Sequence, residues 1–149
     1  MTEEFEPPLE PLLWIEPQAG VLAWLADTRP LRFVLVTSRR TGRWVFPKGG
    51  IEDGMTAADT AAQEAFEEAG LIGRPLPDPI GRYRTPKIRP PLIWTVEVAL
   101  YTMRIDSVLD RWIEEDQRQR RFVTLEEARG LMDEPEMLAL AEKFVAIRD

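Results

Sequence analysis

Residues 49–71 read GGIEDGMTAADTAAQEAFEEAGL, a glycine-rich turn followed by a run of alanines and acidic residues. The stretch from Lys48 to Gly54 holds three of the glycines and is not expected to form a regular helix or strand. Thr56 is a typical N-cap, residues 57–69 strongly favour a helix, and Gly70 stands where a helix normally ends. The sequence therefore predicts a glycine-rich loop that leads directly into an α-helix.

This helix presents two different surfaces. One consists of small apolar residues and is suited to close packing on a β-sheet. Its members are Ala58, Ala61, Ala62, Ala65 and Ala69. On the other, Glu64, Glu67 and Glu68 gather, because residues three and four apart are neighbours on a helix. Three adjacent carboxylates repel one another, and a cation between them would remove that repulsion.

Ligands that are all oxygen favour Mg²⁺, with Mn²⁺ as the alternative, over zinc. An E-x-x-E-E pattern alone is most often a solvated helix face. The glycine-rich loop immediately ahead of this helix favours a metal site instead.

The composition narrows the chemistry further. The chain has 149 residues, which suits one domain, and contains neither cysteine nor histidine. Disulfides, thiolate or histidine metal sites, cysteine nucleophiles and serine–histidine triads are therefore excluded. The net charge of −7 argues against broad binding to nucleic acid or to anionic lipid. A phosphorylated small molecule would need a local basic patch or a bridging cation.

The remaining segments predict an α/β protein in which helices cover a mixed sheet. Residues 1–17 are rich in proline and glutamate and predict an extended, partly disordered arm. Strands are expected at residues 19–25, 32–37, 80–84 and 92–105, with a short apolar segment at 44–46 and a loop at 106–121. Thr124 and Glu127 form a capping-box pattern for a short helix, and Pro135 begins a last helix that runs to about Ile147.

No apolar run approaches the ~20 residues that a membrane span requires. The N-terminal residues have neither the basic nor the apolar region of a signal peptide, so a cytoplasmic protein with no membrane segment is expected. The five tryptophans and the proline-rich arm could serve a homodimer interface, although single aromatic residues more often lie in a core.

The segment from Gly49 to Leu71 resembles the Nudix box, G-x5-E-x7-R-E-U-x-E-E-x-G-U, in which U is aliphatic. The matching positions, aligned without gaps, are Gly49, Glu64, Glu67, Glu68, Gly70 and Leu71, with Ala65 as a small version of the first U. Met55 stands where the box has its first glutamate, and Gln63 stands where it has arginine. The lead-in from Trp44 to Gly49 and the later Glu52 are also typical of this family.

The resemblance implies a Nudix fold over residues 18–149, with a mixed β-sheet sandwiched between α-helices. It implies that Glu64, Glu67 and Glu68 are catalytic and hold Mg²⁺, with the Gly49 carbonyl as a further ligand. In the family the metal neutralises phosphate oxygens and activates a water that attacks phosphorus in line. Since the chain has no histidine, the general base must be a carboxylate or a hydroxide held by the metal.

The two departures from the box cancel in charge, because one lost residue is acidic and the other is basic. Losing both members of an ion pair is milder than losing one, which strands an unpaired charge. The hypothesis is that Met55 and Gln63 replace a supporting ion pair while the metal-holding glutamates remain. The alternative is a degenerate Nudix module that binds a phosphorylated ligand without turnover.

Three groups of basic residues are expected to flank the site and to bind a highly phosphorylated small substrate. They are Arg39, Arg43 and Lys48; Lys87 and Arg89 in a second loop; and Arg118 and Arg121 in a third. Together with the motifs around them, they resemble the diphosphoinositol polyphosphate and diadenosine polyphosphate hydrolase branch of the family. Glu115, or its neighbour Glu114, falls where related enzymes supply an extra metal ligand or base. An equal alternative is that these glutamates only keep a surface loop soluble.

The expected function is thus Mg²⁺-dependent hydrolysis of a phosphoanhydride bond in a diadenosine polyphosphate or diphosphoinositol polyphosphate. A Nudix pyrophosphatase for a modified nucleoside triphosphate, a nucleotide sugar or an RNA 5′ end is the alternative within the same family.

Overall fold

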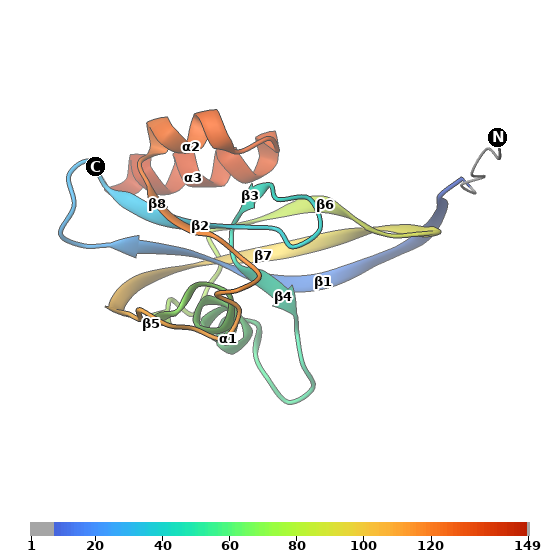
Figure 1. The fold of residues 1–149 in the computed structure, drawn as a ribbon, viewed down its shortest axis with the longest axis horizontal. Coiled ribbons are helices and arrows are strands. Elements are labelled where there is room, and N and C mark those ends of the chain that lie inside the picture. Colours follow the sequence, from blue (N-terminus) through green and yellow to red (C-terminus); the bar gives the residue numbers. More distant parts are fainter. Residues whose placement is uncertain (1–7, 149) are drawn as a thin grey trace.

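The computed structural model describes residues 8–148, which form one mixed β-sheet with helices on both sides (Figure 1). The strands are β1 (Glu10–Leu25), β2 (Arg32–Thr37), β3 (Trp44–Val45), β4 (Lys48–Gly50), β5 (Leu71–Pro75), β6 (Gly81–Arg89), β7 (Leu92–Val108) and β8 (Arg120–Val123). The helices are α1 (Ala57–Ala69), α2 (Leu125–Leu131) and α3 (Pro135–Arg148). No helix in this described part of the chain is both long and apolar enough to cross a membrane.

The sheet is organised around a parallel pair of long strands. Its central path runs β3-β2-β1-β7-β5, while β4 pairs with β1, β6 with β7 and β8 with β2. β1 and β7 run parallel, with Val21 beside Tyr101, and the other paired strands are antiparallel. The parallel pair joins β1 to a strand that lies far from it in the sequence.

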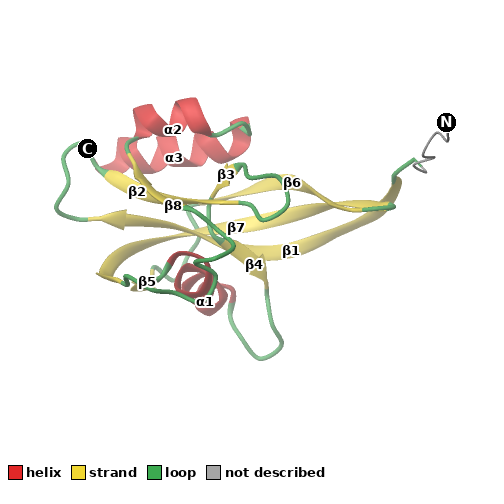
Figure 2. Ribbon diagram, viewed as in Figure 1, coloured by secondary structure: helices red, strands yellow, loops and turns green. Residues whose placement is uncertain are grey.

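The two faces of the sheet carry separate cores, and Figure 2 shows α1 on one side and α2 with α3 on the other. Under α1, the core includes Ala19, Val21 and Ala23 of β1 with Ala61, Ala65 and Ala69 of the helix. On the other face, it includes Leu22, Phe33, Phe46 and Tyr83 with Met137, Ala141 and Phe144 of α3. The expected arrangement of a mixed sheet between helices is confirmed.

Helix α1 begins and ends where its local sequence indicates. The Thr56 side chain accepts a hydrogen bond from the Asp59 N–H at 3.0 Å, and Gly70 adopts a left-handed φ of 65°. Its end is also tied down by Arg120, whose guanidinium donates to the Ala69 carbonyl and lies 4.0 Å from the centroid of the Trp112 ring. These contacts position the helix that carries Glu64, Glu67 and Glu68.

Two expectations for loops were wrong. Lys48–Gly50 is a strand rather than irregular chain, because its backbone pairs with β1, with Gly49 opposite Ala19. Lys87 and Arg89 lie in β6 rather than in a loop, since pairing with β7 extends this strand well beyond its apolar residues. Leu71–Pro75, which was not expected to be a strand, forms β5 and pairs with the far end of β7. β4 and β5 depend on partners distant in sequence, whereas the added residues of β6 belong to a tight hairpin with β7, in which Arg89 lies opposite Leu92.

β1 begins before the expected strand at residue 19. From Glu10 to Pro17 it lies beside Leu92–Glu97 of β7, with an irregularity in register between Pro11 and Ile15. Together with β6, these segments extend away from the body of the protein (Figure 1). Of the arm expected over residues 1–17, residues 1–7 lie outside the described residues.

Gly70→Ala should lower the free energy of unfolding by about 1–3 kcal/mol. Alanine is strained at the left-handed φ of Gly70, and its Cβ would lie 2.8 Å from the Trp112 Cβ. Denaturant unfolding measures the change. Gly130→Ala is the matched control, because this position lies in α2 with open space around the added Cβ, so a gain of up to about 1 kcal/mol is expected. Equal effects of the two substitutions would contradict this account.

Candidate active site

Helix α1 faces β4 at Gly49. A Cβ added to Gly49 would overlap the carboxylate of Glu64 in its present position. The pairing of β4 with β1 holds this stretch of backbone in place, so the glycine brings the main chain directly against the acidic side of the helix. Gly49 and Glu64, two of the predicted metal ligands, thus lie against each other, and their role in holding a metal stays a prediction.

Glu64 and Glu68 form a coupled pair of carboxyl groups. Glu68 is only 3% exposed, and burial followed by its hydrogen bond to Glu64 raises the pKa of Glu68 to about 9. Burial also raises the pKa of Glu64, although the hydrogen bond from Glu68 opposes this increase. The raised pKa of Glu68 favours its protonated form near neutral pH, in which Glu68 donates the hydrogen bond and the Glu64 carboxylate accepts it.

Glu67 is oriented by one of the residues that departs from the Nudix box. The Gln63 side-chain amide donates to Glu67 Oε1 at 2.8 Å, one turn along the helix. Gln63 therefore contacts one of the predicted metal ligands itself. An amide performs this orienting contact without adding a positive charge.

The loop between β7 and β8 brings a fourth carboxylate to the helix. Its Glu114 N–H donates to the Glu67 carbonyl at 3.0 Å, and the Glu114 side chain accepts from Arg118 Nε at 2.9 Å. The same guanidinium donates to the Thr37 carbonyl at 3.0 Å and lies 3.6 Å from Glu68 Oε2. Arg118 is nearly buried and serves to hold these groups together.

Lys48 enters the site from β4. Its Nζ donates to Gln18 Oε1 at 3.1 Å. Burial lowers the pKa of Lys48, and the nearby charge of Glu68 partly opposes this effect. The ammonium group thus lies within electrostatic range of the carboxylate pair.

The other predicted site residues are distributed around this centre. Arg39 donates to Gln117 and lies 3.9 Å from Glu114, on a groove of about 440 Å³ that Trp44 and Glu115 also line. Glu115 itself is paired with Arg111 at 2.8 Å. The structure thus places Glu114 rather than Glu115 against α1.

Three further basic residues have separate surroundings. Arg43 lies 3.8 Å from Asp133, and Arg121 lies 3.8 Å from Glu127 of α2. Arg89 is at the outer end of β6, opposite Leu92. None of these contacts is with α1.

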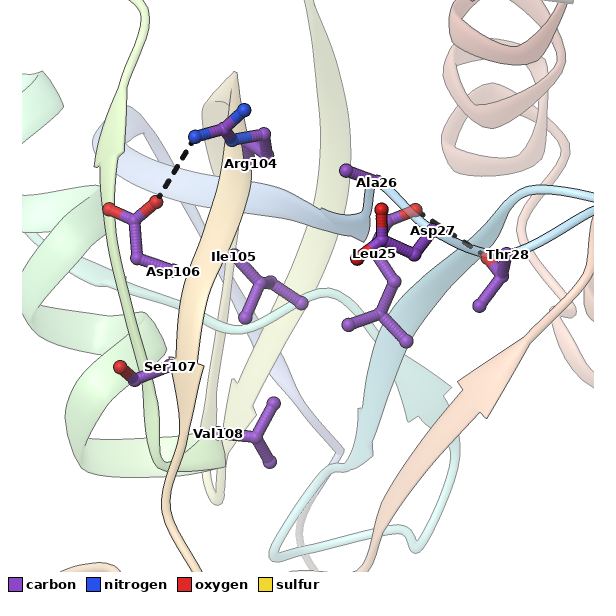
Figure 3. Close-up of a pocket in the computed structure, with 9 residues that line it drawn as sticks. All are labelled: Leu25, Ala26, Asp27, Thr28, Arg104, Ile105, Asp106, Ser107 and Val108. Carbon is purple, nitrogen blue, oxygen red and sulfur yellow. Dashed lines mark hydrogen bonds and ion pairs between the residues drawn. The ribbon is translucent and has the colours of Figure 1, made fainter.

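A second groove, of about 430 Å³, lies at the other end of β1, between the β1–β2 turn and the last residues of β7 (Figure 3). It includes Asp27, Thr28 and Ser107, together with an ion pair of 3.7 Å between Arg104 and Asp106. None of the predicted site residues lines it.

Within residues 8–148, no three carboxylates are gathered closely enough to hold a metal ion as they stand. The chemistry of the donors nevertheless fits a hard divalent cation, because Glu64, Glu67, Glu68 and the Gly49 carbonyl supply only oxygen. The protonated pair fits as well, since metal binding displaces protons from its ligands.

Comparison with known proteins agrees with this geometry. The model of the NUDIX domain matches residues 16–144. The chain belongs to the Nudix family. Two Arabidopsis thaliana relatives are Nudix hydrolase 4, 29% identical over 122 residues, and Nudix hydrolase 16, mitochondrial, 33% identical over 119 residues. The alignments cover 82% and 76% of this chain but only 58% and 66% of those relatives. The chain thus spans about three fifths of their length.

Solved structures confirm the Nudix fold. The crystal structure of a C. elegans Ap4A hydrolase superposes with a TM-score of 0.68, covering 91% of this chain and 100% of that one, at 21% sequence identity. The departures at Met55 and Gln63 therefore occur within an intact Nudix architecture.

Glu68→Gln should stabilise the metal-free protein, and more at about pH 8 than at about pH 5. Folding raises the pKa of Glu68 from 4.5 to about 9, so between these values the folded state binds more protons than the unfolded state. The free energy of unfolding therefore falls as pH rises through this window. Glutamine resembles the protonated acid and does not titrate, so the variant keeps this stability at high pH. Its free energy of unfolding near pH 8 should exceed that of the wild type by on the order of 2 kcal/mol.

Calorimetry in the presence of a chelator, across this pH range, measures the effect. Glu126→Gln is the control, because Glu126 is exposed on α2. A gain that did not depend on pH, or a loss at high pH, would show that Glu68 is not protonated in the folded protein.

Proposed function

We propose that this Nudix protein is a Mg²⁺-dependent hydrolase that cleaves a phosphoanhydride bond in a dinucleoside polyphosphate or a diphosphoinositol polyphosphate. The observation that carries the proposal is the neighbouring pair of half-buried Glu64 and buried Glu68 on the family's box helix, with Glu64 directly against the Gly49 backbone. Removing neighbouring carboxylates from water destabilises a fold, and a bound cation would offset that cost.

In this proposal, Glu64, Glu67, Glu68 and the Gly49 carbonyl hold the cation. When bound, Mg²⁺ would supply charge neutralisation of the phosphate oxygens and make a bound water more acidic. Gln63 keeps Glu67 in place through its 2.8 Å hydrogen bond.

Glu114 is the loop carboxylate best placed to accept a proton from the attacking water. It adjoins α1, and its charge contributes to the raised pKa of both Glu64 and Glu68. Arg118 acts as a positioning residue, because its side chain is engaged with Glu114, Glu68 and the Thr37 carbonyl. A catalytic role for Glu115 stays a prediction; this residue lines the groove beside Arg39 and is paired with Arg111.

Substrate phosphates would be met by cations around this centre. Lys48 is the nearest to the carboxylate pair, and Arg39 lies on the adjoining groove. Roles for Arg43, Lys87, Arg89 and Arg121 in substrate binding stay predictions. The name of the C. elegans structure, an Ap4A hydrolase, supports the dinucleoside polyphosphate class.

The wider setting of the enzyme is also a matter of prediction. The acidic chain favours a small phosphorylated substrate over nucleic acid. The cytoplasmic location and the homodimer expected from the sequence stay predictions, and several relatives are named as mitochondrial.

Mg²⁺-dependent product release from dinucleoside polyphosphates, diphosphoinositol polyphosphates, modified nucleoside triphosphates, nucleotide sugars and capped RNA tests the proposal. Hydrolysis of the first or second class is expected. Glu67→Gln and Glu68→Gln should each reduce kcat by about 100-fold or more, and Glu114→Gln by about 100-fold, since each removes a proposed ligand or base. Glu126→Gln should retain full activity. No hydrolysis by the wild type on the whole panel would favour the non-catalytic module.

Restoring the box residues tests whether Met55 and Gln63 replace an ion pair. Gln63→Arg alone should be neutral or harmful, because it adds a charge beside Glu67 that must be satisfied. Adding Met55→Glu should recover or improve activity relative to that single variant, with a coupling of about 0.5–3 kcal/mol. A double-mutant cycle on the Mg²⁺-dependent rate measures this coupling. Additive effects would refute the paired replacement.

A further inference from the structure

β1, β6 and β7 extend beyond the body of the protein toward the hairpin between β6 and β7 (Figure 1). Two tryptophans stack near this end of the sheet. Trp14 of β1 and Trp94 of β7 have ring centroids 5.9 Å apart and planes within 13° of each other. Trp14 remains 51% exposed although Trp94 supports it. An exposed indole backed by a second ring is a surface on which another flat ring can stack.

A line of polar side chains joins this stack to the active site along β1. Gln18 accepts a hydrogen bond from Lys48 and donates one to Glu16. Glu16 lies beside Val96 and Gln18 beside Val98 in the parallel register with β7. Alternate residues of a strand share a face, so these side chains lie on the same face as Trp94 and its stacking partner.

Lys87 adds a second cation to the same face. It is directly opposite Trp94 in the pairing of β6 with β7, and its Nζ lies 5.9 Å from the Trp94 ring centroid. Its charge also lowers the pKa of Lys48. This face of the sheet, on which Val96 and Val98 pack with the core under α3, therefore carries two cations, and Lys48 is the one near enough to Glu68 for that carboxyl to raise its pKa.

Proceeding outward from Lys48, the surface offers a cation, then a carboxylate, then an aromatic ring with a second cation, Lys87, beside it. A nucleotide presents its groups in the matching order: phosphates for Lys48, ribose hydroxyls for Glu16, and a flat base for Trp14. The four steps along the strand from Gln18 to Trp14 cover roughly 13 Å. That span accommodates a phosphate, its sugar and its base laid end to end.

We propose that Trp14, supported by Trp94, binds a nucleobase of the substrate, with the ribose at Glu16 and the phosphate chain at Lys48. This inference rests on the proposed hydrolase function and selects dinucleoside polyphosphates over diphosphoinositol polyphosphates. An inositol ring is puckered and densely charged, so it cannot stack on an indole in the way a base does.

The test compares Trp14→Ala with Leu13→Ala, a matched control at a fully exposed neighbouring position. Trp14→Ala should raise KM for diadenosine tetraphosphate about tenfold, the loss typical of one base–aromatic stack, with kcat within about twofold. KM for a diphosphoinositol polyphosphate should not change. Trp14→Phe should keep most of the affinity, because it restores an aromatic surface. Equal KM values for the wild type and Trp14→Ala would overturn the proposal.

A measurement without turnover separates this inference from the hydrolase function. Calorimetric titration with a methylene-bridged, non-hydrolysable analogue of diadenosine tetraphosphate, in Mg²⁺, should show about tenfold weaker binding only for Trp14→Ala. Such a result supports base binding at Trp14 (the Trp14 platform) even if the wild type hydrolyses nothing. The absence of hydrolysis would then refute the hydrolase function alone. Equal affinity in all variants, or no binding by the wild type, overturns the platform. So does a changed oligomeric state of Trp14→Ala at unchanged affinity, which would assign the stack to a subunit contact.

Discussion

The burial of Glu68 beside Glu64 is the constraint around which the rest of the site is arranged. A buried carboxyl needs a proton, a counter-charge or a cation, and each neighbouring element contributes to that need. β4 must approach without a side chain at Gly49, the loop before β8 must deliver Arg118, and α1 must pack closely on the sheet through its alanines. Elements from three separate parts of the chain therefore support the single turn of α1 from Glu64 to Glu68.

Local signals were sufficient to predict the helices. Thr56 and Gly70 bound α1, and the capping box at Thr124 begins α2, because each signal acts within a few residues of the chain. The two strands that were missed, β4 and β5, form because they pair with distant partners. Nothing in Leu71–Pro75 or in Lys48–Gly50 indicates a strand until β7 and β1 are beside them.

In the site, too, local spacing predicted some features, whereas others depend on contacts between distant segments. The spacing of Glu64, Glu67 and Glu68 places them on one side of α1, whereas the choice between Glu114 and Glu115 depends on how the loop folds back. Spacing could not decide between them, because Arg111 with Glu115 and Glu114 with Arg118 are both four residues apart and both pair. Arg118 was expected to bind substrate phosphates; its nearly buried contacts with α1 and β2 could not be predicted, since no local rule brings those segments together.

The parallel pairing of β1 with β7 also has a consequence for how the chain reaches this state. Val21 lies beside Tyr101, so the central strand of the sheet gains its parallel neighbour only once residues 92–108 have been made. A nascent chain emerging from the ribosome would hold β1 and α1 before that neighbour exists. Contacts between such distant segments slow folding, and they leave apolar edges exposed meanwhile. Synthesis of β7 is thus the step that commits the molecule to its native topology.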